Sequence, residues 1–158
     1  MKRFFFVFLL LGCADIERDN PQDPSNVDGK VYSTAVINGK LWMHENLNHK
    51  VSGSKCYNDD PEYCEWGGRL YSYGMAKDVC PGTWRLPTAD EMNALPSSFF
   101  NQGTGYYITK EDRFDGSGFN SFWLSDGEIY SVYGSKRQFI GSGYYVNVRC
   151  VKDLKEDL

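Results

Sequence analysis

Residues 79–95, which read V-C-P-G-T-W-R-L-P-T-A-D-E-M-N-A-L, constrain the fold of this chain more than any other stretch. Cys80 stands in front of a turn signal, Pro81-Gly82. Trp84 and Leu86 alternate around one polar residue, so both side chains point to the same side of a short extended piece. The first half of the segment therefore predicts a cysteine anchor followed by a buried turn.

The second half of the same segment predicts the start of a helix. Thr88 is a good N-cap residue, and Glu91 three positions later completes a capping-box pattern. Pro87 disfavours helix before this point, and Pro96 cannot continue one beyond Leu95. We therefore expect a helix that begins at Thr88 and runs through Leu95.

Four further cysteines follow Cys13: Cys56, Cys64, Cys80 and Cys150. Three pairings are open. A local bridge between Cys56 and Cys64 is natural because they flank a polar loop, and Cys80 then pairs with Cys150. None of the spacings contains the C-x2-C pair typical of structural zinc sites, so we expect disulfides and neither metal nor cofactor.

The N-terminus predicts a bacterial lipoprotein signal peptide over residues 1–12. Lys2 and Arg3 form a basic start, and the apolar run 4–11 reaches only about 12 Å as a helix, too short for a bilayer of ~30 Å. The run ends in L-L-G-C, which resembles a lipobox, so we expect lipidation of Cys13. Ala14 after it, rather than aspartate, resembles the pattern of outer-membrane lipoproteins and so favours the outer membrane. We also expect the domain to be displayed at the cell surface.

Composition and charge divide the mature chain. Residues 13–30 are acidic and proline-containing without apolar periodicity, which predicts a flexible tether. Residues 31–153 form the expected domain, and residues 154–158 a tail.

Loss of Lys2 and Arg3 with the signal peptide leaves 15 basic against 21 acidic residues, a net charge of −6. That charge argues against nucleic acid, or an anionic membrane surface, as a ligand.

Turn signals and alternation predict the remaining elements. A hairpin is expected over residues 31–43 around Asn38-Gly39, and a helix over residues 71–79. Strands are expected at residues 122–125, 128–133, 136–140 and 144–151. In the last strand one face, expected in the core, carries Tyr144, Val146, Val148 and Cys150, and the other carries Tyr145, Asn147, Arg149 and Val151.

Residues 79–95 resemble the V-C-P-x-G-W-x-L-P-[ST]-x-x-E-W-x-x-L signature of the Fibrobacter succinogenes major paralogous domain, with Met92 in place of the second tryptophan. The resemblance extends to W-M-H-E-N-L, G-R-L-Y-S-Y, F-W-L-S and V-R-C-V-K-D, and so covers residues 31–153. That family looks related to C-type-lectin-like folds, including formylglycine-generating enzymes. The resemblance implies an α+β, C-type-lectin-like domain with short antiparallel strands, two short helices and long loops.

Catalytic patterns are weak in this sequence. His44 and His49 have only Glu45 nearby, which is too few ligands for a metal site, and no nucleophile-base pair stands out. Formylglycine-generating enzymes use a reactive cysteine pair in their C-terminal part, where this chain has only Cys150. We therefore expect a non-enzymatic binding or structural module whose partner is a polysaccharide or an envelope protein. The alternative is an extracytoplasmic enzyme of lectin-like fold.

The glycine-rich region 103–120 is the expected contact surface. Its glycines allow turns that present side chains without strain, and recognition residues usually sit on such loops. The candidate ligand-binding residues there are Tyr106, Tyr107, Phe114, Asp115 and Asn120. A competing interpretation makes residues 106–108 a core strand and leaves only residues 112–120 exposed.

Overall fold

The computed structural model describes residues 26–27, 29–132, 137–138 and 143–154. The expected signal peptide, the lipidation site Cys13 and the tether up to residue 25 therefore lie outside the described residues. Most of the expected tail and much of the strand expected at residues 136–140 also lie outside them. No helix within the described ranges is long and apolar enough to cross a membrane.

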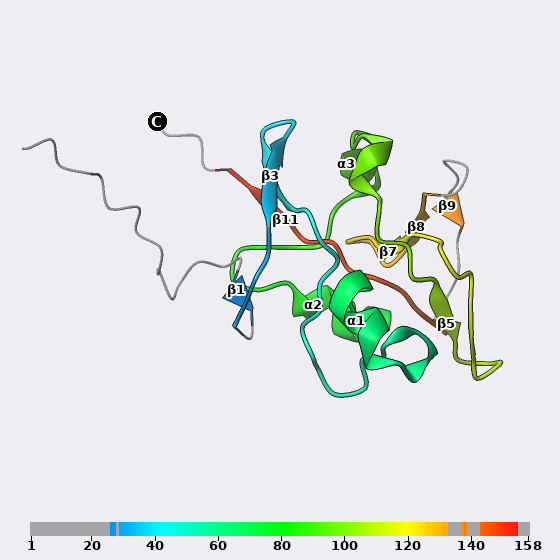
Figure 1. The fold of residues 1–158 in the computed structure, drawn as a ribbon. Coiled ribbons are helices and arrows are strands. Elements are labelled where there is room, and N and C mark those ends of the chain that lie inside the picture. The colour runs from blue at the N-terminus through cyan, green and yellow to red at the C-terminus, as the bar shows by residue number, and fades with distance from the viewer. Residues whose placement is uncertain (1–25, 28, 133–136, 139–142, 155–158) are drawn as a thin grey trace, which may run out of the picture.

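Short helices and small antiparallel sheets make up a mixed α+β fold (Figure 1). The helices are α1 (Pro61–Gly67), α2 (Tyr73–Val79) and α3 (Ala89–Asn93), with 3-10 turns η1 (Tyr57–Asp59) and η2 (Ser97–Phe99). The strands are β1 (Asn26–Val27), β2 (Lys30–Val31), β3 (Thr34–Ile37), β4 (Lys40–Met43), β5 (Tyr106–Ile108), β6 (Arg113–Asp115), β7 (Ser121–Trp123), β8 (Ile129–Ser131), β9 (Arg137–Gln138), β10 (Tyr144–Tyr145) and β11 (Val151–Asp153). They form sheets in the orders β1-β2, β11-β4-β3, β10-β5-β6 and β7-β8-β9.

The expected hairpin is confirmed as β3 and β4. Asn38 and Gly39 have φ angles of 51° and 71°, the left-handed conformation that a tight two-residue turn between strands requires. Trp42 and Met43 are buried, at 1% and 0% exposure. Trp42 and Met43 are neighbours in β4 and therefore point to opposite faces of the sheet, where they join two different core clusters, so the end of β4 is buried on both faces.

The capping box at the start of α3 is also confirmed. The Thr88 hydroxyl accepts a hydrogen bond from the Glu91 N–H at 3.3 Å, and the Glu91 carboxylate accepts one from the Thr88 N–H at 2.8 Å. The helix is shorter than expected and ends at Asn93. The Leu95 N–H bonds to the Met92 carbonyl instead, which tightens the chain into a turn ahead of Pro96.

Helix α2 is confirmed, but α1 was not predicted. The polar loop between Cys56 and Cys64 contains a helix start, because Asp60 accepts a hydrogen bond from the Glu62 N–H at 2.9 Å and Pro61 occupies the first helical turn. An aspartate followed directly by proline is the N-cap signal that the sequence contained. The disulfide joins Cys56, just before η1, to Cys64 in the middle of α1.

The folded part begins earlier than residue 31, so the predicted tether boundary is wrong. β1 pairs with β2, with Gly29 at a φ of 78° in the turn between them. Val27 is 8% exposed and belongs to the main core cluster, together with Tyr32 and Met43. A single apolar residue in a polar segment gives no periodicity, which is why the sequence did not reveal this contact.

The long final strand predicted over residues 144–151 is wrong. Only Tyr144–Tyr145 (β10) and, from Val151 on, β11 are paired as strands, while Val146 and Asn147 make isolated bridges to Tyr71 and Phe122. Every residue from 146 to 151 is buried, at 1% exposure or less. The segment passes between core clusters and has no solvent face, so its polar members are buried as well.

Both disulfides have the predicted pairing. Cys56 bonds to Cys64, and Cys80 bonds to Cys150 across 70 positions of sequence. Cys150 is fully buried in the main cluster, and Cys80 packs against the same cluster. The long bridge thus ties the turn before α3 to the C-terminal segment.

Candidate ligand-binding site

The predicted contact residues are partly brought together, in the sheet β10-β5-β6. β5 pairs with β6 so that Tyr106 lies opposite Asp115 and Tyr107 opposite Phe114. Asn120 lies apart from them, directly before β7, and its side-chain amide donates to the Phe100 carbonyl at 3.2 Å.

Tyr107, one of the predicted contact residues, is buried in the core. Its ring is 8% exposed and packs in a small core cluster with Tyr57 and Leu70. The phenol donates a hydrogen bond of 2.6 Å to Asp112, which raises the pKa of Tyr107 to about 12. The competing interpretation, a core strand at residues 106–108, therefore holds for this side chain.

The other members of the predicted surface are half-buried and engaged within the protein. The Phe114 ring packs between Tyr57 and Tyr107, with centroids 5.4 and 5.0 Å away. Asp115 accepts a 2.7 Å hydrogen bond from the Gly116 N–H and pairs with Arg113 at 2.5 Å, and these bonds lower the pKa of Asp115. These residues therefore support the sheet more than they offer free polar groups.

A cavity of about 490 Å³, here called the tyrosine pocket, lies beside this sheet. Its size falls in the range of small-molecule sites in proteins. It is formed by the first turn of α2, the end of β7, the residue after β5 and the start of β10. The lining residues are Ser72, Tyr73, Gly74, Thr109, Trp123, Gly143, Tyr144 and Tyr145.

Aromatic rings form the walls of the tyrosine pocket and are held from behind by other rings. Tyr73 packs against Trp123 with centroids 5.3 Å apart. Tyr144 packs against Tyr106 at 6.0 Å, and Tyr145 against Tyr107 at 5.5 Å. Two of the predicted contact residues thus position pocket tyrosines.

The polar groups of the tyrosine pocket are neutral and open. The hydroxyls of Ser72, Thr109, Tyr144 and Tyr145 make no hydrogen bond within the described part of the chain. The Tyr73 hydroxyl, in contrast, donates to the Ser125 carbonyl at 3.1 Å. The described lining contains no charged side chain, so the pocket offers hydroxyl groups and aromatic faces without an ion.

Sequence reasoning missed this pocket because it had assigned its residues to other roles. Tyr73 falls within the helix expected over residues 71–79, and Tyr144 lies on the expected core face of the last strand. In the structure both are half-buried. The one available signal was Tyr145, which alternates out of phase with the expected core face.

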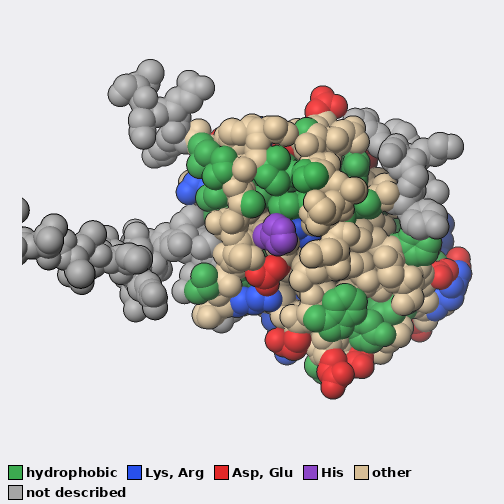
Figure 2. Space-filling model, turned by 45° about the horizontal axis from the view of Figure 1, so that its top comes forward, with side chains coloured by type: hydrophobic (Ala, Val, Ile, Leu, Met, Phe, Trp, Pro, Cys, Tyr) green, Lys and Arg blue, Asp and Glu red, His purple; other side chains and the backbone are tan. Residues whose placement is uncertain are grey.

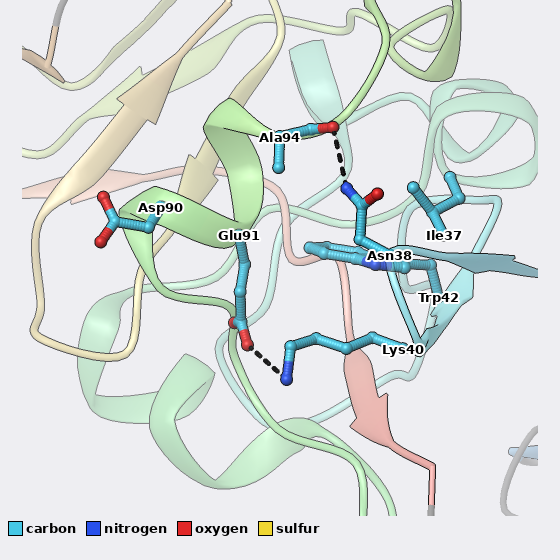
Figure 3. Close-up of a pocket in the computed structure, with 7 residues that line it drawn as sticks. All are labelled: Ile37, Asn38, Lys40, Trp42, Asp90, Glu91 and Ala94. Atoms are coloured by element: carbon cyan, nitrogen blue, oxygen red, sulfur yellow. Dashed lines mark hydrogen bonds and ion pairs between the residues drawn. The ribbon is translucent and has the colours of Figure 1, made fainter.

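A second cavity, here called the hairpin–helix pocket, lies between β3-β4 and α3 (Figure 3). Its volume is about 240 Å³, and its lining residues are Ile37, Asn38, Lys40, Trp42, Asp90, Glu91 and Ala94. The Asn38 side-chain amide donates to the Ala94 carbonyl at 3.3 Å, and Lys40 pairs with Glu91 at 3.3 Å. The Asn38, Lys40 and Glu91 side chains at its edges are therefore already engaged within the protein.

Glu91 belongs to an ion cluster below this pocket. Arg85 binds it through both terminal nitrogens at 2.9 and 2.7 Å, and Asp153 pairs with Arg85 at 3.0 Å and with Lys40 at 2.5 Å. The Arg85 hydrogen bonds hold the pKa of Glu91 down at about 2. The cluster is ionised and satisfied at neutral pH, so it ties α3 to β4 and β11 and leaves no free acid or base.

No group of three or more histidine, cysteine, aspartate or glutamate side chains that could hold a metal ion occurs among the described residues. The aromatic, hydroxyl-bearing cavity is therefore the candidate site that the geometry supports best. No protein-family model, curated protein or solved structure matches this chain.

Proposed function

We propose that this protein is a non-catalytic binding module that takes a neutral sugar unit of a polysaccharide in the tyrosine pocket. The observation that carries the proposal is the combination of aromatic walls with four open hydroxyls and no charged group in the described lining. Sugars present apolar C–H faces and a ring of hydroxyls. Aromatic rings pack against the C–H faces, and hydroxyl side chains exchange hydrogen bonds with the sugar hydroxyls.

The resemblance to the Fibrobacter succinogenes major paralogous domain supports a C-type-lectin-like fold for the same domain, and short antiparallel sheets with short helices are consistent with it. A binding role also agrees with the position of the buried Cys80–Cys150 bridge, which serves the core. The enzymatic alternative would need a reactive group, and no geometry among the described residues favours one.

Replacing Tyr144 with alanine is expected to weaken polysaccharide binding about tenfold or more, because the sugar loses an aromatic wall. Thr109→Val keeps the shape of the side chain but removes one hydroxyl, and a loss of several-fold is expected. Binding of the full-length protein to an array of neutral and acidic glycans identifies the ligand, and titration calorimetry with the best glycan measures each variant.

Trp66→Ala is the matched control. Trp66 is an exposed aromatic residue, at 48%, on α1 and outside the tyrosine pocket, so its loss should leave affinity unchanged. Melting temperatures separate folding from binding. If the Tyr144 variant is folded and binds the glycan as tightly as the wild type, the sugar does not bind in the tyrosine pocket. A preference for acidic over neutral glycans would contradict the uncharged lining of the pocket.

We further propose that the module is anchored to the outer membrane through a lipid on Cys13 and displayed at the cell surface. The L-L-G-C box behind an apolar run too short to span supports this. Cys13→Ala should leave an unprocessed precursor or release the protein from the membrane fraction. Fractionation and acyl-chain labelling check this, and an alanine variant that is still acylated would refute it.

A further inference from the structure

Strand β3 lies at an open edge of its sheet. The order β11-β4-β3 leaves β3 paired on one side only, and no other strand of the described chain pairs with it. Figure 1 shows β3 standing at the margin of the fold, next to α3 and away from the other sheets. An open edge presents backbone donors and acceptors in a row.

The register identifies which backbone groups point outward. The His44 N–H donates to the Ser33 carbonyl at 2.8 Å, so Ser33 and every second residue after it bond toward β4. Thr34 and Val36 alternate with these and direct their N–H and C=O groups away from the sheet. Neither residue has another backbone hydrogen bond in the described ranges.

The edge lacks the features that usually block strand addition. The residues of β3 are Thr34, Ala35, Val36 and Ile37, with no charge and no proline. Val36 is 62% exposed. Figure 2 shows hydrophobic side chains gathered on the face where β3 and α3 come forward.

An apolar cavity lies beside this edge. Ile37, the last residue of β3, lines the hairpin–helix pocket together with Trp42 and Ala94 (Figure 3). Because Asn38 and Lys40 at its edges are hydrogen-bonded or ion-paired within the protein, the pocket offers carbon surface to a guest. One apolar side chain fits this chemistry, and its insertion would remove apolar surface from water.

The charge around the pocket favours a cationic guest. Lys40 and Arg85 are neutralised by Glu91 and Asp153 in the ion cluster. Asp90 is exposed and has no cation partner among the described residues, and it lies on the side of α3 away from Lys40 (Figure 3). Among the residues of the rim that the structure describes, Asp90 is therefore the uncompensated negative charge.

We propose that β3 accepts an extended segment of another, cationic protein as an added strand. Backbone hydrogen bonds to Thr34 and Val36 supply affinity, an apolar side chain enters the hairpin–helix pocket, and a lysine or arginine beside it pairs with Asp90. Strand addition with alternate side chains in pockets is a recurrent mode of peptide recognition. This site is separate from the tyrosine pocket and does not depend on sugar binding.

The test uses the full-length protein and two blocked seven-residue peptides that alternate valine and threonine around a central leucine. One peptide ends in lysine at both termini, and the other in glutamate. We expect the lysine peptide to bind the wild-type protein at least about tenfold more tightly than the glutamate peptide does. With the Asp90→Asn variant, most of this difference in affinity should disappear. Binding of the lysine peptide should also slow amide hydrogen exchange at Thr34 and Val36.

Variants of the protein separate the pocket from the edge. Ala94→Phe fills the pocket from α3 and is expected to weaken the lysine peptide about tenfold or more, whereas Asn93→Phe places the same ring outside the pocket lining and should not. Val36→Pro removes an outward N–H and should also weaken binding. Failure of the wild type to bind either peptide, binding that Ala94→Phe leaves unchanged, or self-association through β3 in place of peptide binding would each overturn the proposal.

Discussion

Replacing Arg149 with methionine is expected to lower the free energy of unfolding by about 3 kcal/mol or more. Arg149 is fully buried, and its guanidinium is held by neutral acceptors. It donates to the side-chain oxygen of Asn46 through Nε at 3.2 Å and through Nη2, and from Nη1 to the carbonyls of His44 at 3.0 Å and Phe99 at 3.2 Å.

Aromatic rings complete the environment of this cation. The guanidinium carbon lies 5.1 Å from the Phe99 centroid and 5.4 Å from that of Phe122, within cation–π range. Burial lowers the pKa of Arg149 to about 9, so the side chain is still charged at neutral pH. Methionine fills much of the volume but leaves the Asn46 oxygen and two carbonyls without donors, and each unsatisfied group costs about 1–3 kcal/mol.

Arg113→Met is the matched control for this substitution. Arg113 is exposed on β6 and pairs with Glu111 and Asp115 at the surface, so its loss should leave the free energy of unfolding nearly unchanged. Urea unfolding followed by tryptophan fluorescence measures both variants. A loss below about 1 kcal/mol for Arg149→Met would show that the three acceptors find other donors.

Local signals in the sequence predicted local structure well. The Asn38-Gly39 turn and the capping box of Thr88 and Glu91 are decided by groups within a few residues, and both formed as expected. The cysteine pairing was also predicted from the sequence, because a bridge between Cys56 and Cys64 across a short polar loop leaves only Cys150 as a partner for Cys80.

The alternation of polar and apolar residues gave a wrong prediction for the final segment, because that segment has no side exposed to solvent. The rule that one side of a strand is polar assigned Arg149 to an outer face, but the segment runs between core clusters and buries both sides. The acceptors of Arg149 come from residues 44, 46 and 99, more than forty positions away. No local sequence pattern predicts a buried arginine whose acceptors come from such distant residues.

The candidate site was predicted only in part, for the same reason. The glycine-rich region did form a paired sheet containing Tyr106 and Tyr107, yet the tyrosine pocket itself is assembled from Tyr73, Trp123 and Tyr144. These residues belong to α2, β7 and β10, which the fold brings together from distant parts of the chain. Their common pocket is a property of the tertiary arrangement rather than of any segment.

Removing the long disulfide should destabilise the domain more than removing the short one. In the chain-entropy model, the bridge between Cys80 and Cys150, 70 positions apart, contributes about 4.4 kcal/mol, and the bridge between Cys56 and Cys64, 8 apart, about 2.6 kcal/mol. The long bridge also lies against the main core, so a Cys80→Ala, Cys150→Ala double variant adds a cavity cost.

The short bridge, in contrast, closes a surface helix. Its sulfurs accept hydrogen bonds from the Arg69 guanidinium at 3.5 and 3.3 Å, so the Cys56→Ala, Cys64→Ala variant loses a local contact but little core packing. Urea unfolding of both double variants under identical non-reducing conditions compares the losses. Loop length and packing against the main core cluster both favour the long bridge, so the order of the two losses is the decisive part of the prediction. An equal or greater loss from the short bridge would mean that local structure around α1, rather than closure of the long loop, limits the stability of this fold.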